Sequence, residues 1–404
     1  MSVPWIGDKW WVSPFNFVDE IRRNFRIPEE VIFHDVTLRD GEQTPCVVFT
    51  MEEKVEIAKA LDEIGVQRIE GGMPIVSEDD MKAIKTMVKE GLRAKIFGFA
   101  RLVKGDIDAV IQSEAQGVIC EGPIGVPKLK QYGWSKEELY NKIITTIDYA
   151  KSHGLYTVFF GVDMTRADLK FLLDLLTYLD KETKVDGFAI VDTYGCSTPE
   201  GFGYLVKSIA DRVKKPLEVH THNDFGLAVI NTIYGILNGA KVAHVSVNGI
   251  GERCGNAAFE EVALALRLLY GIPLKIKFEK LYELSKLVEK LSGFKVAKNK
   301  PVIGDYAFTR ESGISVAGWL KYNLGSEAYL PELVGNFHNV KLGKKSGRHS
   351  VEWKLRELGL EATEEEVSEI VQHIKDLSIK KKNCIDDEEL IHIYKMIKMK
   401  QHKK

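Results

Sequence analysis

The stretch VIFHDVTLRDG, residues 31–41, joins a short apolar run of strand-forming residues to a polar end. A segment of helical period follows over residues 52–64, where Val55, Ala58 and Leu61 fall on one face. This order of apolar run, polar end and helix-length segment recurs through residues 30–275. It predicts eight strands, over 31–38, 68–72, 95–100, 117–121, 156–162, 187–192, 217–222 and 244–248.

Eight alternating strand and helix units predict an α/β protein, a (β/α)8 TIM barrel with a mainly helical C-terminal appendage. An open, doubly wound parallel sheet is the alternative, but no G-x-G-x-x-G follows the first strand. We therefore divide the chain into an N-terminal extension, a barrel and a C-terminal linker and subdomain region, over residues 1–29, 30–275 and 276–404.

The appendage breaks the rhythm of the barrel. A helix is predicted over 278–291, and a glycine-rich, irregular stretch over 304–347. Two amphipathic helices are predicted after it, over 364–377 and 386–399.

Composition narrows the class of protein. The 404 residues carry 56 Lys and Arg against 58 Asp and Glu, and this balance argues against a general nucleic-acid-binding surface. No apolar run is long enough to span a membrane, and residues 1–11 lack the pattern of a signal peptide. The five cysteines are scattered, which fits a reducing compartment. We expect a cytoplasmic protein without nucleic-acid or membrane partners.

Polar residues cluster where the predicted strands end, which is where a barrel places its chemistry. His220 and His222 are two residues apart on one strand and therefore point to the same side. With Asp40 after the first strand, they suit a divalent metal such as Mg²⁺, Mn²⁺ or Zn²⁺. A pair of hydrogen-bonded structural histidines is the alternative.

Two further segments carry candidate residues. Arg39, beside Asp40, could stabilise a developing oxyanion, although Asp-Gly also suits a surface turn. The loop GIGERCGN, residues 249–256, could approach a ligand, with Asn256 as an oxygen ligand or as the cap of the next helix. GKKSG at 343–347 lacks the first glycine of a phosphate loop, so no triphosphate site is expected there.

Five motifs in this order are together specific. They are HDVTLRDGEQTP (34–45), IEGGMP (69–74), VDTYGCSTP (191–199), VHTHNDFGLAVINT (219–232) and GIGERCGNAAFEEV (249–262). With KPVIGDYAFTRESGI (300–314) and LGKKSGRHS (342–350), the chain resembles the DRE-TIM metallolyases over residues 30–355. Within them it resembles the isopropylmalate, homocitrate and citramalate synthase group.

The resemblance implies a metal-dependent Claisen-type condensation of an acyl-CoA, usually acetyl-CoA, with a 2-oxo acid. The products are a 2-hydroxy-dicarboxylic acid and CoA, which makes the enzyme an acyltransferase. It implies that Arg39 and Glu70 are catalytic, that Thr193 binds the substrate carboxylate, and that the metal ligands are Asp40, His220, His222 and Asn256. It also implies that the barrel is the catalytic domain, and we expect no regulatory domain after the appendage. It further implies a homodimer, because the appendage of such enzymes crosses to the neighbouring barrel.

Three departures from the family pattern fall on the substrate side. The usual histidines of the first appendage motif are replaced across residues 310–315, where Arg310 could bind an anion but not serve as a base. Val162 stands where a glutamate is usual, while Asp163 is kept as a substrate-side residue. The usual histidine after the fourth strand is missing from residues 121–130. These changes predict an unusual substrate pair or the reverse reaction.

Two alternatives therefore stay open. One is a lyase of the same superfamily that cleaves a 3-hydroxyacyl-CoA or a hydroxy acid. The other is a metal-binding barrel without catalysis, retained as a partner subunit.

Overall fold

A computed structural model describes residues 3–401 and contains a closed barrel of eight parallel strands, in the order β10-β3-β4-β5-β6-β7-β8-β9. The predicted (β/α)8 barrel is confirmed, and the open-sheet alternative is wrong because β10 pairs with both β9 and β3. The strands are β3 (Ile32–Asp35), β4 (Arg68–Gly72), β5 (Lys95–Arg101), β6 (Gly117–Pro123), β7 (Tyr156–Val162), β8 (Gly187–Asp192), β9 (Leu217–Thr221) and β10 (Val242–Val245).

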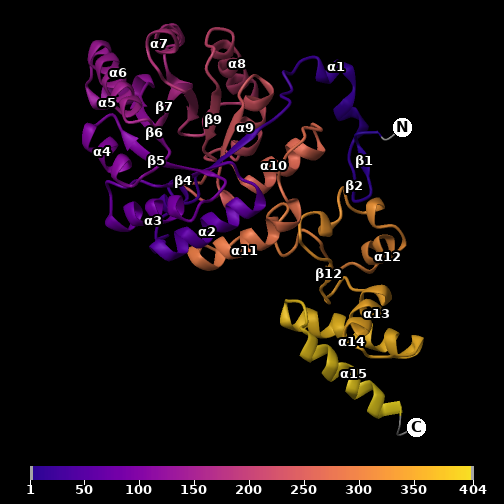
Figure 1. Cartoon of the computed structure of the whole chain (residues 1–404). Helices are drawn as coiled ribbons and strands as arrows, with labels where there is room; N and C mark the ends of the chain where they lie inside the picture. The colour runs from indigo at the N-terminus through magenta and orange to yellow at the C-terminus, as the bar shows by residue number, and fades with distance from the viewer. Residues whose placement is uncertain (1–2, 402–404) are drawn as a thin grey trace. The chain divides into compact units, whose positions relative to one another are not determined.

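Helices follow each strand and surround the barrel (Figure 1). They are α2 (Met51–Ile64), α3 (Glu78–Lys89), α4 (Lys104–Gln112), α5 (Val126–Tyr132), α6 (Lys136–Ser152), α7 (Leu169–Glu182), α8 (Pro199–Ala210), α9 (Ala228–Leu237), α10 (Phe259–Leu268) and α11 (Leu281–Ser292). Before the barrel lie β1 (Ile6–Gly7), β2 (Trp10–Trp11) and α1 (Asp19–Arg22).

Local sequence explains where these helices begin and end. The Thr50 hydroxyl accepts a hydrogen bond from the Glu53 amide, and the Glu53 carboxylate accepts one from the Thr50 amide. This capping box satisfies two amides that the first turn of α2 leaves free. The helix ends at Gly65, whose φ of 105° suits glycine.

The last strand lies earlier than the sequence predicted. Residues 244–248 were expected to be extended, but β10 ends at Val245 and a 3-10 turn covers Val247–Gly249. Asn248 has a φ of 63°, and the Ser246 hydroxyl donates a hydrogen bond to the Ile250 carbonyl at 2.6 Å. The chain therefore leaves the barrel wall before the glycine-rich loop begins.

The described chain forms two compact units. One is Ser13–Val296, and the other joins the residues up to Val12 with those from Ala297 onward. The proposed boundary after residue 275 therefore falls inside the barrel unit. The reason is that α11 packs on α2, and the Asn248 side chain exchanges hydrogen bonds with Ser285 of α11.

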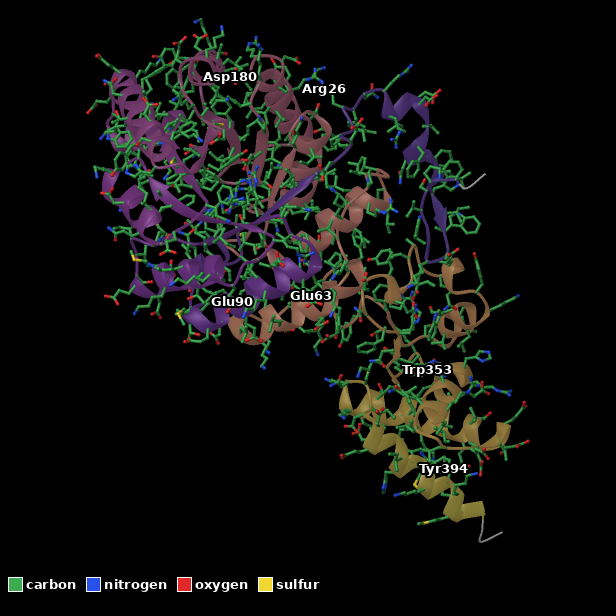
Figure 2. The ribbon with its side chains drawn as sticks, viewed as in Figure 1. Arg26, Glu63, Glu90, Asp180, Trp353 and Tyr394 are labelled. Carbon is green, nitrogen blue, oxygen red and sulfur yellow. The ribbon has the colours of Figure 1, made fainter. Side chains whose placement is uncertain are left out.

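The second unit has a hydrophobic core of its own. It contains β11 (Thr309–Arg310), α12 (Gly313–Lys321), β12 (Asn339–Val340), α13 (Arg348–Glu357), α14 (Glu364–Lys381) and α15 (Asp387–Gln401). Trp353 and Tyr394 pack partly buried against this core (Figure 2). The helix α12 lies within the stretch that was predicted to be irregular, because Val316 and Trp319 are buried in the core.

Among the helices described for residues 3–401, none combines the length and the apolar character needed to cross a bilayer.

Candidate active site

The ends of neighbouring strands bring the predicted metal-ligand residues together. His220 lies in β9 and His222 follows it directly, so the alternation of a strand turns both rings to the barrel interior. Asp40 follows β3, two strands away around the barrel. All three side chains are buried.

The three side chains are close enough to share one ion. The Asp40 Oδ2 atom lies 3.3 Å from His220 Nε2 and 3.6 Å from His222 Nε2. The two Nε2 atoms are 3.2 Å apart. One carboxylate and two imidazoles at this spacing form a donor set that suits a divalent cation.

The charges of this group also suit a cation. Burial alone raises the pKa of Asp40, but the Arg39 charge and a hydrogen bond from His220 outweigh burial and hold the pKa well below its usual range. Burial lowers the pKa of His220 to about 3 and also lowers the pKa of His222. The group is therefore an ionised carboxylate beside two neutral imidazoles with lone pairs to offer.

Asn256 lies next to this group. It pairs with His222 in an isolated β-bridge. Its Nδ2 donates to the Ile250 carbonyl at 3.2 Å, while its buried Oδ1 has no hydrogen-bond partner within residues 3–401. The expectation that Asn256 caps the next helix is wrong, because Ala258 occupies the cap of α10. A free amide oxygen beside His222 is what a fourth ligand needs.

Arg39 is held between two carboxylates. Its Nε donates to Glu70 Oε1, and its Nη1 donates to Asp40 Oδ2 at 3.1 Å. The guanidinium carbon lies 4.0 Å from the centre of the Phe99 ring. Its buried Nη2 has no partner among the described residues. The Nη2 group of Arg39 is therefore free to donate a hydrogen bond to a ligand beside the candidate metal ligands.

A cavity of about 750 Å³ opens above these residues within the barrel unit. Its polar floor includes Arg39, Asp40, His220 and His222. Its walls come mainly from β5 to β8 and from α5, and include Phe99, Arg101, Glu121, Pro123, Lys128, Tyr132, Trp134, Phe160, Val162, Val191, Thr193 and Tyr194. This volume is large enough for a small ligand and part of a larger one.

The predicted substrate residues do not all lie on this wall. Thr193 does, and its hydroxyl accepts a hydrogen bond from the Asp163 amide at 2.8 Å. The buried Asp163 carboxylate is instead held by Arg166 in two hydrogen bonds, of 2.7 and 2.9 Å. Arg310 belongs to the other compact unit, where it pairs with Glu327 at 3.0 Å.

Residues 30–288 match the family described as HMGL-like. The chain belongs to the HMGL-like family. Residues 302–382 also match a family described as homocitrate synthase post-HMGL domain-like.

Named relatives of this HMGL-like chain include synthases. It is 40% identical to homocitrate synthase AksA of Methanothermobacter thermautotrophicus, covering 96% of this chain and 98% of that protein. It is 44% identical to a putative (R)-citramalate synthase CimA of Archaeoglobus fulgidus, covering 92% of this chain and 76% of that protein. The predicted resemblance to the DRE-TIM synthase group is confirmed.

A solved HMG-CoA lyase from Bacillus subtilis shares the fold of the HMGL-like barrel. The TM-score is 0.61 at 20% sequence identity, and the match covers 68% of this chain and 97% of that one. At this identity the likeness concerns the fold alone.

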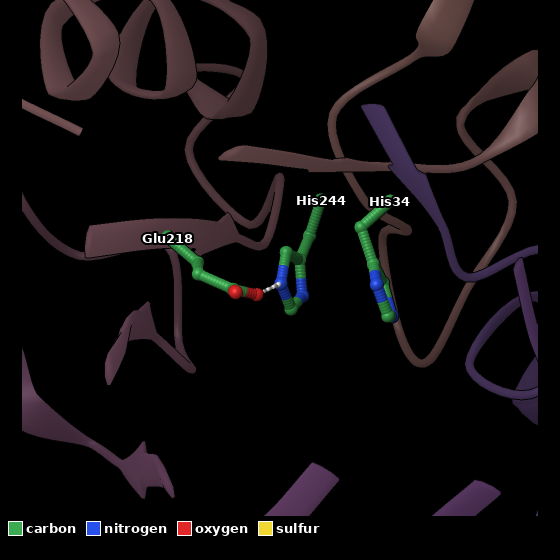
Figure 3. A group of neighbouring side chains, drawn as sticks. All are labelled: His34, Glu218 and His244. Atoms are coloured by element: carbon green, nitrogen blue, oxygen red, sulfur yellow. Dashed lines mark hydrogen bonds and ion pairs between the residues drawn. The ribbon is translucent and has the colours of Figure 1, made fainter. Parts of the chain in front are cut away.

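The HMGL-like barrel also holds a buried cluster that the sequence analysis missed. His34 of β3, Glu218 of β9 and His244 of β10 lie together, with the two imidazole rings stacked 4.4 Å apart (Figure 3). His244 Nε2 lies 2.7 Å from Glu218 Oε2, and His34 Nε2 lies 3.1 Å from Glu70 Oε2. Polar residues inside otherwise apolar strands were the available signal for this cluster.

Arginines pair with the carboxylates that contact this cluster. The Glu218 carboxylate also accepts a hydrogen bond from Arg68 at 2.7 Å, as Glu70 does from Arg39. Burial alone would raise the pKa of either glutamate, but their partners lower both values to about 2. Burial lowers the pKa of His34 to about 4, so this ring is neutral. Each of the two glutamates is thus paired with one arginine and one histidine, and we infer that the cluster holds Glu70 in place.

Proposed function

We propose that this chain catalyses a divalent-metal-dependent condensation of an acyl-CoA, with acetyl-CoA as the expected donor, with a 2-oxo acid. The products are CoA and a 2-hydroxy acid that carries one more carboxylate than the 2-oxo acid, which is a 2-hydroxy-dicarboxylic acid when the 2-oxo acid has one carboxylate. One observation carries the proposal: Asp40, His220 and His222 meet beside Arg39 at the floor of a cavity. Relatives named as synthases that cover more than nine-tenths of this chain support it.

We propose Asp40, His220, His222 and Asn256 as ligands of Mg²⁺, Mn²⁺ or Zn²⁺. The donor set fits because it joins one ionised carboxylate, two neutral imidazoles and an unpartnered amide oxygen. When bound, the ion would act as a Lewis acid on the substrate oxygens.

Other residues around the cavity are proposed to stabilise charge and to bind the substrates. The free Nη2 of Arg39 can donate to the oxygen on which negative charge develops, and its fixed charge lowers the cost of that step. Glu70 holds the guanidinium in its orientation. The Thr193 hydroxyl on the cavity wall can bind the carboxylate of the 2-oxo acid. Arg101, Lys128 and Arg253 add positive charge around an opening that must admit anionic substrates.

Thiol release from acetyl-CoA tests this proposal. The assay contains Mg²⁺ or Mn²⁺ and, in separate reactions, glyoxylate, pyruvate, oxaloacetate, 2-oxobutyrate, 2-oxoisovalerate or 2-oxoglutarate. We expect release with at least one of these acids, with loss of release after chelation. If none of the six acids gives thiol release and the protein cleaves a 3-hydroxyacyl-CoA, the lyase alternative replaces the synthase proposal.

We also propose that the chain forms a homodimer, as its resemblance to the synthases implies, and that it is cytoplasmic, as its scattered cysteines indicate. Mass measurement at micromolar concentration tests the dimer, and a monomer under those conditions contradicts it.

A further inference from the structure

Glu121 is a carboxylate of the cavity wall to which the proposed function gives no task. It lies near the end of β6, paired in register with Arg101 of β5 and Phe160 of β7. It is partly buried and lines the same cavity as Arg39 and His220. Its side chain thus borders the space in which a substrate would react.

The carboxylate of Glu121 has no partner within residues 3–401, although cations surround it. Those cations are engaged elsewhere. Arg101 donates to Asp106 at 2.7 Å, Lys128 donates to Gln131 at 3.2 Å, and Arg39 is held by Glu70. A structural ion pair therefore does not explain why a carboxylate occupies this wall.

The surroundings make this carboxylate a better proton acceptor than an exposed one. Burial raises the pKa of Glu121, and Asp106 adds to that rise. The positive charges of Arg39, Arg101 and Lys128 act in the opposite direction without cancelling it. An unpaired carboxylate of raised basicity in a cavity is a typical general base.

We propose that Glu121 is the general base and then the general acid of the condensation. This inference rests on the proposed function. It also supplies the acid–base group that the replaced histidines of the family pattern would otherwise provide.

The Glu121 carboxylate takes one proton from the methyl group of the acetyl thioester, and the electron pair of the broken C–H bond forms the enolate. The enolate carbon bonds to the carbonyl carbon of the 2-oxo acid, and the π electron pair of that carbonyl moves to its oxygen. The resulting alkoxide takes the proton from the Glu121 carboxylic acid, which restores the carboxylate. Hydrolysis of the thioester then consumes one water and releases the thiol of CoA.

Substitution of Glu121 tests this assignment in the full-length, metal-loaded protein. We expect Glu121→Gln to lower kcat by roughly 100- to 10,000-fold, the range of general acid–base catalysis, with little change in KM. Glu121→Asp should retain part of the activity, because it keeps a carboxylate. Glu137→Gln removes the same charge from an exposed position on α6 and should leave kcat unchanged. Metal content, measured on each variant, should not change.

Two further readouts separate catalysis from structure. In D₂O, wild-type protein should incorporate deuterium into the acetyl methyl group in the presence of an unreactive 2-hydroxy acid, and Glu121→Gln should not. The wild-type rate should fall as the pH drops through the pKa of Glu121, and this limb should vanish in Glu121→Gln.

The outcomes separate the two proposals. In one outcome the wild-type protein is active, and Glu121→Gln keeps its kcat or loses activity only through KM. This outcome overturns the role of Glu121 and leaves the synthase proposal intact. A wild-type protein that neither condenses any acid of the panel nor exchanges the methyl protons overturns the proposed function, and the role of Glu121 with it.

Discussion

At the scale of single residues, the site depends on how each polar group is partnered. Alternation along a strand was enough to predict that His220 and His222 share a direction. That the Asn256 Oδ1 atom finds no hydrogen-bond partner among the described residues could not be predicted, because this depends on a loop that returns to His222, directly after β9. Glu121, like the predicted residues, lies near the end of a barrel strand, but it belongs to no spacing motif that would have identified it.

Removal of His220 should separate metal binding from folding. We expect His220→Ala to lower affinity for Mg²⁺ or Mn²⁺ by roughly 100-fold or more, because it deletes a proposed ligand beside Asp40. Metal content after dialysis measures the effect, and far-UV circular dichroism should stay unchanged. His153→Ala, at the exposed end of α6, is the matched control. Full metal content in His220→Ala would contradict the ligand assignment.

Replacement of His34 should act through Glu70. His34→Leu removes a hydrogen-bond partner from a buried carboxylate, at a cost of about 1–3 kcal/mol in the free energy of unfolding. It should also lower kcat, because Glu70 orients Arg39. His34→Gln keeps an N–H donor and should lose less of both. Equal losses in the two variants, measured by denaturant unfolding and steady-state kinetics, would mean that ring packing rather than the hydrogen bond matters.

At the scale of elements, the strands and most helices follow from the periodicity of the sequence, and the exceptions have one local and one long-range cause. β10 ends early because Asn248 adopts a left-handed conformation that apolar patterning does not reveal. The helix α12 was missed because glycines surround it in the sequence, while its Val316 and Trp319 are buried by contacts with residues far along the chain.

The loop after β10 should tolerate no side chain at Gly251. A Cβ atom there would lie 2.1 Å from Asn256 Nδ2 and 3.0 Å from Asp40 Oδ1. We expect Gly251→Ala to displace these groups and to weaken metal binding by roughly 10- to 100-fold, as changes around a metal site do. Calorimetric titration with Mn²⁺ measures the effect. Gly105→Ala is the control, since its Cβ would meet no atom within 4 Å and the change should not weaken binding.

At the scale of the whole molecule, the order of the elements was predictable, but the limits of its compact units were not. The sequence rhythm stops near residue 275, yet α11 still packs on α2. The N-terminal extension is likewise divided, because Trp10 pairs with Tyr329 whereas Arg26 hydrogen-bonds to the barrel residue Leu237. Contacts between residues distant in sequence set these limits, and one sequence does not display such contacts.

Buried charges should make the metal-free protein sensitive to acid. Burial lowers the pKa of His34 from 6.5 to about 4 and that of His220 to about 3, so the unfolded chain binds these protons first and stability falls below pH 6.5. Asp35, whose pKa burial raises to about 7, and Glu121, whose pKa burial also raises, oppose this trend, and we expect the histidines to outweigh them. Glu70 and Glu218, with pKa values of about 2 in the folded protein, steepen the fall below pH 4.5.

Thermal unfolding at constant ionic strength in the presence of a chelator checks this balance. The midpoint should be lower at pH 4 than at pH 7 by roughly 5 °C or more. A midpoint at pH 4 that equals or exceeds the value at pH 7 would mean that Asp35 and Glu121 outweigh the histidines.

The two sides of the cavity come from different strands and can therefore diverge in sequence independently. The candidate metal and oxyanion residues come from one side of the barrel: the two histidines from β9 and its end, Arg39 and Asp40 from the loop after β3, and Glu70 from β4. Strand β10 lies between β9 and β3. Strands β5 to β8 supply most of the opposite wall of the cavity. Mutations can therefore accumulate on one arc of the barrel while selection holds the other constant. A duplicated gene can acquire a new substrate in single steps without passing through an ancestor that has lost its metal.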